Sequence, residues 1–253
     1  MSDSRSTKGS AGLMADEQIR VQPRRVPKEI IDRFLALEDL AGTVSDVLDQ
    51  LGITGVVCAS ELKPTIIGRR AVGTAITLRN VPQKADPHFA LTHELNLMSE
   101  IEAIHQSEPG DVLVIQGVPK VSNMGGIIAT ICTRQKLAAA VVDGGIRDVN
   151  HSRALGFPIW SRDLSPITGK WRVISTEVNG TIDVAGVTVR AGDLVVADET
   201  GICFIPQDRV EEVLAICEAT DKKEAGWVED LGRGITIPDI MPHLYKILPN
   251  RKK

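Results

Sequence analysis

The stretch AAAVVDGGIRD, residues 138–148, decides the fold class that we expect. Five apolar residues predict a short buried strand, which ends at Asp143 and turns through two glycines to Arg147 and Asp148. In open α/β sheets, ligands bind beyond the carboxyl ends of the strands. The stretch therefore predicts a strand end that presents a guanidinium beside a carboxylate, although chemistry alone leaves open a simple surface ion pair after a tight turn.

Helix-like and strand-like segments alternate on both sides of this stretch. Apolar residues at helical spacing predict helices over residues 27–40, 43–52, 90–106, 125–138 and 209–231. Apolar runs predict strands within residues 69–82, 109–117, 157–163 and 191–201, and a β-hairpin within 178–193. The alternation indicates an α/β class, and the hairpin indicates a mixed sheet.

Polar residues give two local expectations. Thr43 or Ser45 is the candidate N-cap of the helix over 43–52. In the helix over 90–106, we expect His93, Glu94 and Glu100 on the solvent-exposed side.

No linker divides the chain. We expect a flexible tail over residues 1–26, one domain over 27–247 and a short C-terminal tail over 248–253.

Composition narrows the classes of partner. Of the 253 residues, 43% are hydrophobic and only 3% aromatic, so the core must be built from Val, Ile, Leu and Ala. The net charge of −4 argues against nucleic acid as the main partner, because phosphate binding needs a basic face. No apolar run reaches the roughly 18 residues that span a bilayer, and the polar N-terminus carries no export signal. We therefore expect a cytoplasmic protein with no membrane partner and with reduced thiols at Cys58, Cys132, Cys203 and Cys217.

Two further segments could bind a ligand. SNMGGIIAT, residues 122–130, places Gly125 and Gly126 at a helix start, where backbone N–H groups suit a carboxylate or phosphate. ADETG, residues 197–201, puts Asp198 and Glu199 at the end of an apolar strand. Taken alone, the first segment is more often a plain helix start, and the second is most often a solvated turn. The sequence contains no H-x-x-x-H, G-x-S-x-G, P-loop or dinucleotide-binding motif.

Taken in order, the motifs resemble one family. TVSDVLDQLG, PGDVLVIQG, SNMGGIIAT, VVDGGIRD, LGFPIW and VAGVTVRAGDLVVADETG are similar to the RraA-like family, from about Thr43 to Pro206. That family includes 4-hydroxy-4-methyl-2-oxoglutarate and 4-carboxy-4-hydroxy-2-oxoadipate aldolases, which are often oxaloacetate decarboxylases as well. It also includes the regulator of ribonuclease activity A.

The resemblance implies a fold, an assembly and a site. The fold would be a layered β/β/α swivelling-type domain in a homotrimer or hexamer, with active sites between subunits. Arg147 would be catalytic, Asp148 would hold Mg²⁺ or Mn²⁺, and the helix start at Gly125, Gly126, Ile127 and Ile128 would receive the substrate carboxylate. Glu199 of a neighbouring subunit and an acidic residue of the early helix, at Asp46 or alternatively Asp49, would complete the site.

One departure from the family concerns the metal. The related aldolases carry a second metal-side Asp about one helix before the Arg-Asp pair, where this chain has Gly125 and Gly126. Water or substrate would then fill the missing position, and the resemblance to the aldolases is weakest here.

These features predict a metal-dependent C–C lyase of a small 2-oxo acid. The metal and Arg147 would stabilise a pyruvate enolate, which retro-aldol cleavage and decarboxylation share. Glu199 and Asp46 would position the water that moves the proton. The alternative is a non-catalytic binding protein that resembles the ribonuclease regulator. The joint presence of Arg147, Asp148 and Glu199 favours the enzyme, and the missing acid favours the alternative.

Overall fold

The computed structural model describes the backbone of residues 8–244 and the side chains of residues 8–240. Its centre is a mixed sheet with the strand order β1-β12-β11-β3-β4-β6-β7-β2, to which β5 adds beside β6 and β8 beside β3. The strands are β1 Val56–Cys58, β2 Lys63–Pro64, β3 Ala71–Pro82, β4 Val112–Gln116, β5 Ser122–Met124, β6 Ala139–Ile146, β7 Ile159–Leu164, β8 Val173–Val178, β11 Leu194–Ala197 and β12 Gly201–Ile205. Neighbours among β3, β4, β6 and β7 are parallel, and the other pairs on the path are antiparallel. The α/β class and the mixed sheet are confirmed.

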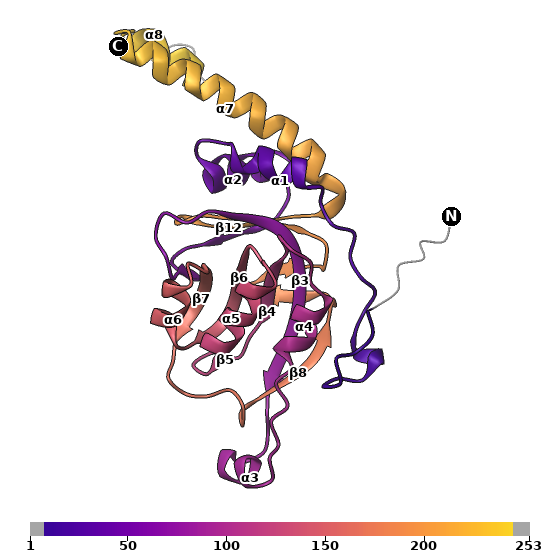
Figure 1. Ribbon diagram of the computed structural model, residues 1–253. Coiled ribbons are helices and arrows are strands. Elements are labelled where there is room, and N and C mark those ends of the chain that lie inside the picture. The colour runs from indigo at the N-terminus through magenta and orange to yellow at the C-terminus, as the bar shows by residue number, and fades with distance from the viewer. Residues whose placement is uncertain (1–7, 245–253) are drawn as a thin grey trace, which may run out of the picture.

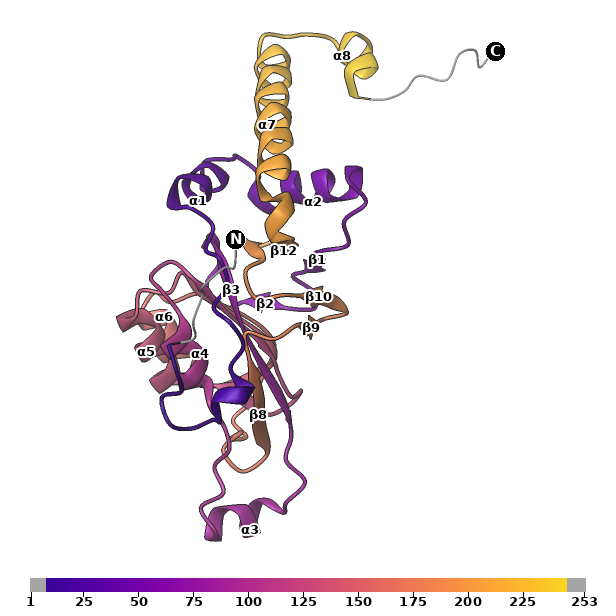
Figure 2. The ribbon, with the colours of Figure 1, turned by 90° about the vertical axis from the view of Figure 1, so that its right-hand side faces the viewer.

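Helices cover the sheet in two groups. The structure contains η1 Asp16–Gln18, α1 Lys28–Leu35, α2 Leu40–Gln50, α3 Pro87–Thr92, α4 Glu100–Gln106, α5 Gly126–Arg134, α6 Val149–Ala154, η2 Gln207–Arg209, α7 Val210–Gly232 and α8 Ile237–Leu244. Figure 1 shows α4, α5 and α6 over the parallel strands, and Figure 2 shows the expected hairpin, β9 Ile182–Val184 and β10 Val187–Val189, on the other side. The helices α1, α2 and α7 pack at the β11–β12 end of the sheet.

The strand β4 illustrates why the parallel strands read as continuous apolar runs. Leu113 and Ile115 are buried beneath α4 and α5, while Val112 and Val114 are buried toward the β9–β10 hairpin. Successive side chains of a strand point to opposite faces, so a strand covered on both faces needs apolar residues at every position. The covered sheet holds β6 in place, and Arg147 follows the carboxyl end of that strand.

Residues 8–26 correct the expectation of a flexible N-terminal tail. Met14 and Ile19 are buried in the same core as α4 and α5. The amide of Ile19 closes the short 3₁₀ turn η1 by donating to Asp16 C=O, and Ile19 forms a β-bridge with Val178 of β8. The buried Glu102 carboxylate accepts hydrogen bonds from the amides of Ala11 and Leu13. The expected C-terminal tail over 248–253 lies outside the described residues.

Two predicted helices differ in their bounds. The helix expected over 90–106 is two helices, α3 and α4, because Ser99 N–H donates to Ser175 Oγ and Leu97 C=O accepts from Ser175, which ties the intervening residues to β8. The second helix begins at Leu40 instead of after Thr43 or Ser45, and Asp198 accepts the amide of Ala41 in its first turn. Tertiary hydrogen bonds therefore override the local signals in both places.

The helix α7 packs with α1 and α2 through its first half, which buries Val213, Leu214 and Cys217. Its second half extends away from the sheet (Figures 1 and 2). Over the part of the chain that the structure describes, none of the helices has the length and apolar character that crossing a bilayer requires.

Candidate active site

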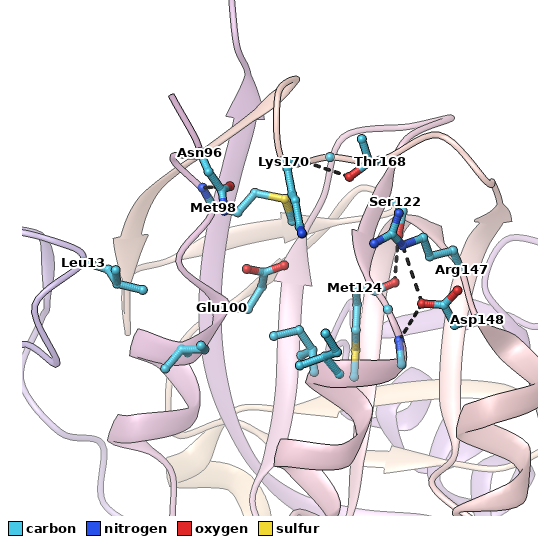
Figure 3. A pocket seen from close by; sticks show the side chains of 16 residues that line it. Leu13, Asn96, Met98, Glu100, Ser122, Met124, Arg147, Asp148, Thr168 and Lys170 are labelled. Carbon is cyan, nitrogen blue, oxygen red and sulfur yellow. Dashed lines mark hydrogen bonds and ion pairs between the residues drawn. The ribbon is translucent and has the colours of Figure 1, made fainter. Parts of the chain in front are cut away.

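A cavity of about 250 Å³ opens where β5 and β6 end and α5 begins. Its walls also include the first turn of α4, the loop at 168–170 and Leu13 of the N-terminal segment. Figure 3 shows these side chains around the opening. Of the predicted residues, it brings together Arg147, Asp148 and Gly125 to Ile128.

The Arg-Asp pair leaves β6 through a left-handed residue. Asp148 has φ of +57° and is the N-cap of α6, a conformation that Asp adopts more readily than most residues. Its Oδ2 accepts the Gly126 N–H at 3.0 Å and lies 3.6 Å from Arg147 Nε. The Arg147 amide donates to Met124 C=O, which joins the ends of β5 and β6. Both side chains are thereby set at the cavity wall.

The first turn of α5 packs closely against neighbouring side chains at its two glycines. A Cβ at Gly125 would lie 2.9 Å from Asp148 Oδ2 and 3.2 Å from Arg147 Nε, and one at Gly126 would lie 3.2 Å from the His151 ring. The Gly126 amide is the one that meets Asp148, while the amides of Ile127 and Ile128 belong to the same first turn, whose N–H groups lack intrahelical partners. Where the related aldolases carry a second acid, this chain therefore has the Gly126 N–H, which donates to Asp148, and Gly125, which packs closely against Asp148 and Arg147.

The donor set for a divalent ion is small. Within the described residues, no group of three or more His, Cys, Asp or Glu side chains could hold a metal. Oδ2 of Asp148 is already engaged, which leaves Oδ1 for a ligand. Mg²⁺ commonly keeps several waters and takes one or two carboxylates together with substrate oxygens. The site therefore fits an ion held mostly by water and substrate, and does not fit an all-protein cage.

Glu100 lines the cavity, contrary to the expectation that it faces solvent. Its relative exposure is 6%, and burial raises the pKa of its carboxyl group to about 7, although Lys170 opposes this rise. The signal in the sequence was Ala103 and Ile104, which lie three and four residues later on the same face of α4 and are buried.

Lys170 also lines the cavity, and it was not among the residues singled out in the sequence. It lies on the loop after β7, which is fastened to β5 because the Ser122 amide donates to Ile167 C=O at 2.8 Å. Nothing in the sequence places this loop beside α4, because the contact joins segments about 70 residues apart.

The structure does not bring Glu199 or Asp46 into the cavity of the same chain. Glu199 is exposed in the turn between β11 and β12, where its Oε2 accepts the Gly68 amide at 3.1 Å. Asp46 and Asp49 are exposed on α2, which packs with α7 (Figure 1). Their predicted roles require a second subunit.

The fold is of the α/β class, and the cavity lies beyond the ends of the parallel strands β5 and β6, the place where open α/β sheets bind ligands. A family model described as RraA-like, Aldolase/RraA, matches residues 41–204. The chain belongs to this RraA-like family, which confirms the resemblance seen in the motifs.

Individual relatives agree with this assignment. A protein of Halalkalibacterium halodurans named "Putative 4-hydroxy-4-methyl-2-oxoglutarate aldolase" is 32% identical over 72% of this chain and 78% of its own length. Protein DlpA of Legionella pneumophila is 28% identical over 68% of this chain, a match that spans only 27% of DlpA. The structure of Streptomyces coelicolor RraAS2, an unusual member of the RNase ES inhibitor RraA family, has a TM-score of 0.66 at 27% identity and covers 84% of this chain and 99% of that chain.

Proposed function

We propose that the chain is a lyase that breaks a C–C bond of a small 2-oxo acid through a pyruvate enolate. The observation that carries the proposal is the convergence of Arg147, Asp148 and the amino end of α5 in one cavity of about 250 Å³. The relative named for an aldolase activity supports the same class of reaction.

The amino end of α5 is the proposed site of the substrate carboxylate. Its unpaired N–H groups and the positive end of the helix dipole attract an anion, and Ile127 and Ile128 lie at the cavity. The Nε edge of Arg147 faces Asp148, so its terminal nitrogens are the ones directed to a ligand. A planar pair of donors suits the 2-oxo oxygen, where negative charge develops as the C–C bond breaks.

Asp148 would hold Mg²⁺ or Mn²⁺ through Oδ1, and the ion, when bound, would supply Lewis-acid polarisation of the 2-oxo group. The protein's own part is to orient the substrate by Arg147 and α5. Retro-aldol cleavage also moves two protons, one from the substrate hydroxyl and one to the enolate carbon. For the hydroxyl proton, we propose a water positioned by Glu199 of a neighbouring subunit, with Asp46 beside it.

Pyruvate release from oxaloacetate tests the proposal. We expect release with Mg²⁺ or Mn²⁺, its loss with a chelator, and its loss in Arg147→Ala. The matched control is Arg134→Ala, an exposed arginine in the last turn of α5. The lyase proposal would be refuted if folded protein released pyruvate no faster than buffer alone with any of the metals. The same protein would also have to fail to cleave 4-hydroxy-2-oxo acids.

A second candidate is a regulatory binding protein without catalysis. Gly125 and Gly126 in place of the expected acid favour it. The likeness to RraAS2, which belongs to a family of RNase ES inhibitors, favours it as well. An absence of turnover together with inhibition of an RNase E-type nuclease would support this candidate over the lyase.

A further inference from the structure

We propose that Glu100 is the catalytic group that exchanges a proton with the substrate carbon in this cavity, and that Lys170 tunes it. The inference rests on the proposed lyase function and names the proton carrier, which would come from the same chain as Arg147.

The position of Glu100 is the first argument. It is the first residue of α4, it is 6% exposed, and it lines the cavity that Arg147 and Asp148 also line. Figure 3 shows its carboxyl group directed into the cavity, with the Lys170 ammonium group turned toward it. A substrate held by Arg147 and the start of α5 would therefore have Glu100 on its other side.

Glu102, two residues later, shows what a structural carboxylate looks like on the same helix. Its oxygens accept from the amides of Ala11 and Leu13 at 2.7 and 2.6 Å and from the Ser10 hydroxyl at 3.0 Å. These donors lower the pKa of Glu102 despite its burial. Within the described residues, no amide of another segment donates to the Glu100 side chain, and the backbone donor that lowers its pKa is its own N–H. Glu102 is thus bound to the N-terminal segment, whereas the Glu100 carboxyl group lines the cavity.

The surroundings of Glu100 suit proton transfer near neutral pH. Burial disfavours its charged form and raises its pKa, and Lys170 acts in the opposite direction. The titratable or charged groups around it are Lys170 on the 168–170 loop, Arg147 and Asp148 after β6, Cys132 on α5, and Glu102 and His105 on α4 itself. A general acid or base works best with a pKa close to the working pH.

The proton step balances without another reactant. When the C–C bond breaks, its electron pair remains on the pyruvate fragment as the enolate. The O–H bond of protonated Glu100 then breaks as a C–H bond forms at C3, which gives pyruvate and a carboxylate that water reprotonates. In reverse, ionised Glu100 takes a C3 proton from bound pyruvate.

Exchange of the pyruvate methyl protons with D₂O, followed by NMR, isolates this step. We expect Glu100→Gln to lose about a hundredfold or more in exchange rate while binding oxalate, a mimic of the enolate, as the wild type does. Glu94→Gln, at an exposed position in the loop before α4, should exchange at the wild-type rate. Retention of oxalate binding shows that the Glu100→Gln site is folded.

The pH profile tests the tuning by Lys170. Wild-type exchange should rise with pH as Glu100 ionises, and Lys170→Met should move the midpoint to higher pH because it removes the charge that lowers the pKa. Wild-type exchange in Glu100→Gln would overturn the assignment of Glu100 even if oxaloacetate is still cleaved. A wild type that binds oxalate but neither exchanges pyruvate nor cleaves any 2-oxo acid would overturn the lyase proposal and this inference with it.

Discussion

The backbone N–H of Gly126 donates to Oδ2 of Asp148 across 3.0 Å. One of the two glycines that stand where the related aldolases carry a second acid therefore orients the proposed metal ligand. An acid at position 126 would add a second carboxylate ligand for the ion. Its Cβ would lie 3.2 Å from the His151 ring, which would have to shift slightly. Because His151 is exposed, its ring has room to move.

Gly126→Asp should raise the affinity for Mn²⁺, since it adds a second carboxylate beside Asp148. Calorimetric titration of Mn²⁺ measures the change, and Gly126→Asn is the control for the added bulk without the charge. The same weak affinity in both variants would show that the second acid does not reach the ion.

Asp148→Asn should greatly weaken Mn²⁺ binding and leave the fold intact. The side chain lies on a turn and is half exposed, and an amide oxygen can still accept the Gly126 N–H. Circular dichroism melting checks the fold and calorimetry checks the metal. Unchanged Mn²⁺ affinity would remove Asp148 from the metal site.

Arg147→Lys should retain much of the substrate binding and lose most of the turnover. Lysine keeps the positive charge but lacks the planar pair of donors. The substitution therefore removes more stabilisation from the developing enolate than from the bound substrate. Steady-state kinetics with oxaloacetate separate the two effects as a lower kcat at similar KM. The same kcat in both proteins would refute the role of Arg147.

Glu100 should make folding stability depend on pH. Burial raises the pKa of its carboxyl group from 4.5 to about 7, so the folded chain holds a proton that the unfolded chain releases. This contribution is complete below pH 4.5 and is lost as the pH rises through 7, a total of about 3 kcal/mol. Glu100→Gln, neutral throughout, should therefore exceed the wild type in unfolding free energy at about pH 8 and match it at about pH 4.5. Urea titrations at several pH values measure these free energies. A difference in unfolding free energy that does not change with pH would contradict the raised pKa of Glu100.

The sequence predicted those parts of the site that follow directly from strands and helix starts. Arg147 and Asp148 were predictable as residues at a strand end because an apolar run precedes them. The expected glycine turn was wrong, because Gly144 and Gly145 continue β6 as far as Ile146 with an irregular register against β7. Gly125 and Gly126 were predictable because a glycine pair precedes a helical pattern. Glu100 was assigned to the wrong side because the helix expected over 90–106 is broken by contacts with β8. Lys170 had no local signal at all, since only the pairing of its loop with β5 brings it to the cavity.

The last prediction concerns Glu199, which should act from a neighbouring subunit. Arg147-Asp148 and Asp198-Glu199 follow the ends of two different strands, β6 and β11, and Glu199 does not line the cavity of its own chain. A closed ring of subunits repeats one head-to-tail contact at every interface, and such a contact can place the β11–β12 turn of one chain at the cavity of the next.

Complementation between two inactive variants tests this arrangement. Asp148→Asn and Glu199→Gln should each lose cleavage of a 4-hydroxy-2-oxo acid, and should regain part of it when they are unfolded and refolded together. Mixed rings contain some interfaces at which both residues are intact, whereas rings of either variant contain none. Because the two variants have the same mass, one of them must carry an isotope label, and native mass spectrometry must then show that mixed oligomers form. Mixed oligomers that are as inactive as either parent would contradict the role of Glu199 in a neighbouring subunit. Glu199 would then be a residue of a solvated turn that accepts the Gly68 amide, and proton transfer would depend on the groups of a single chain.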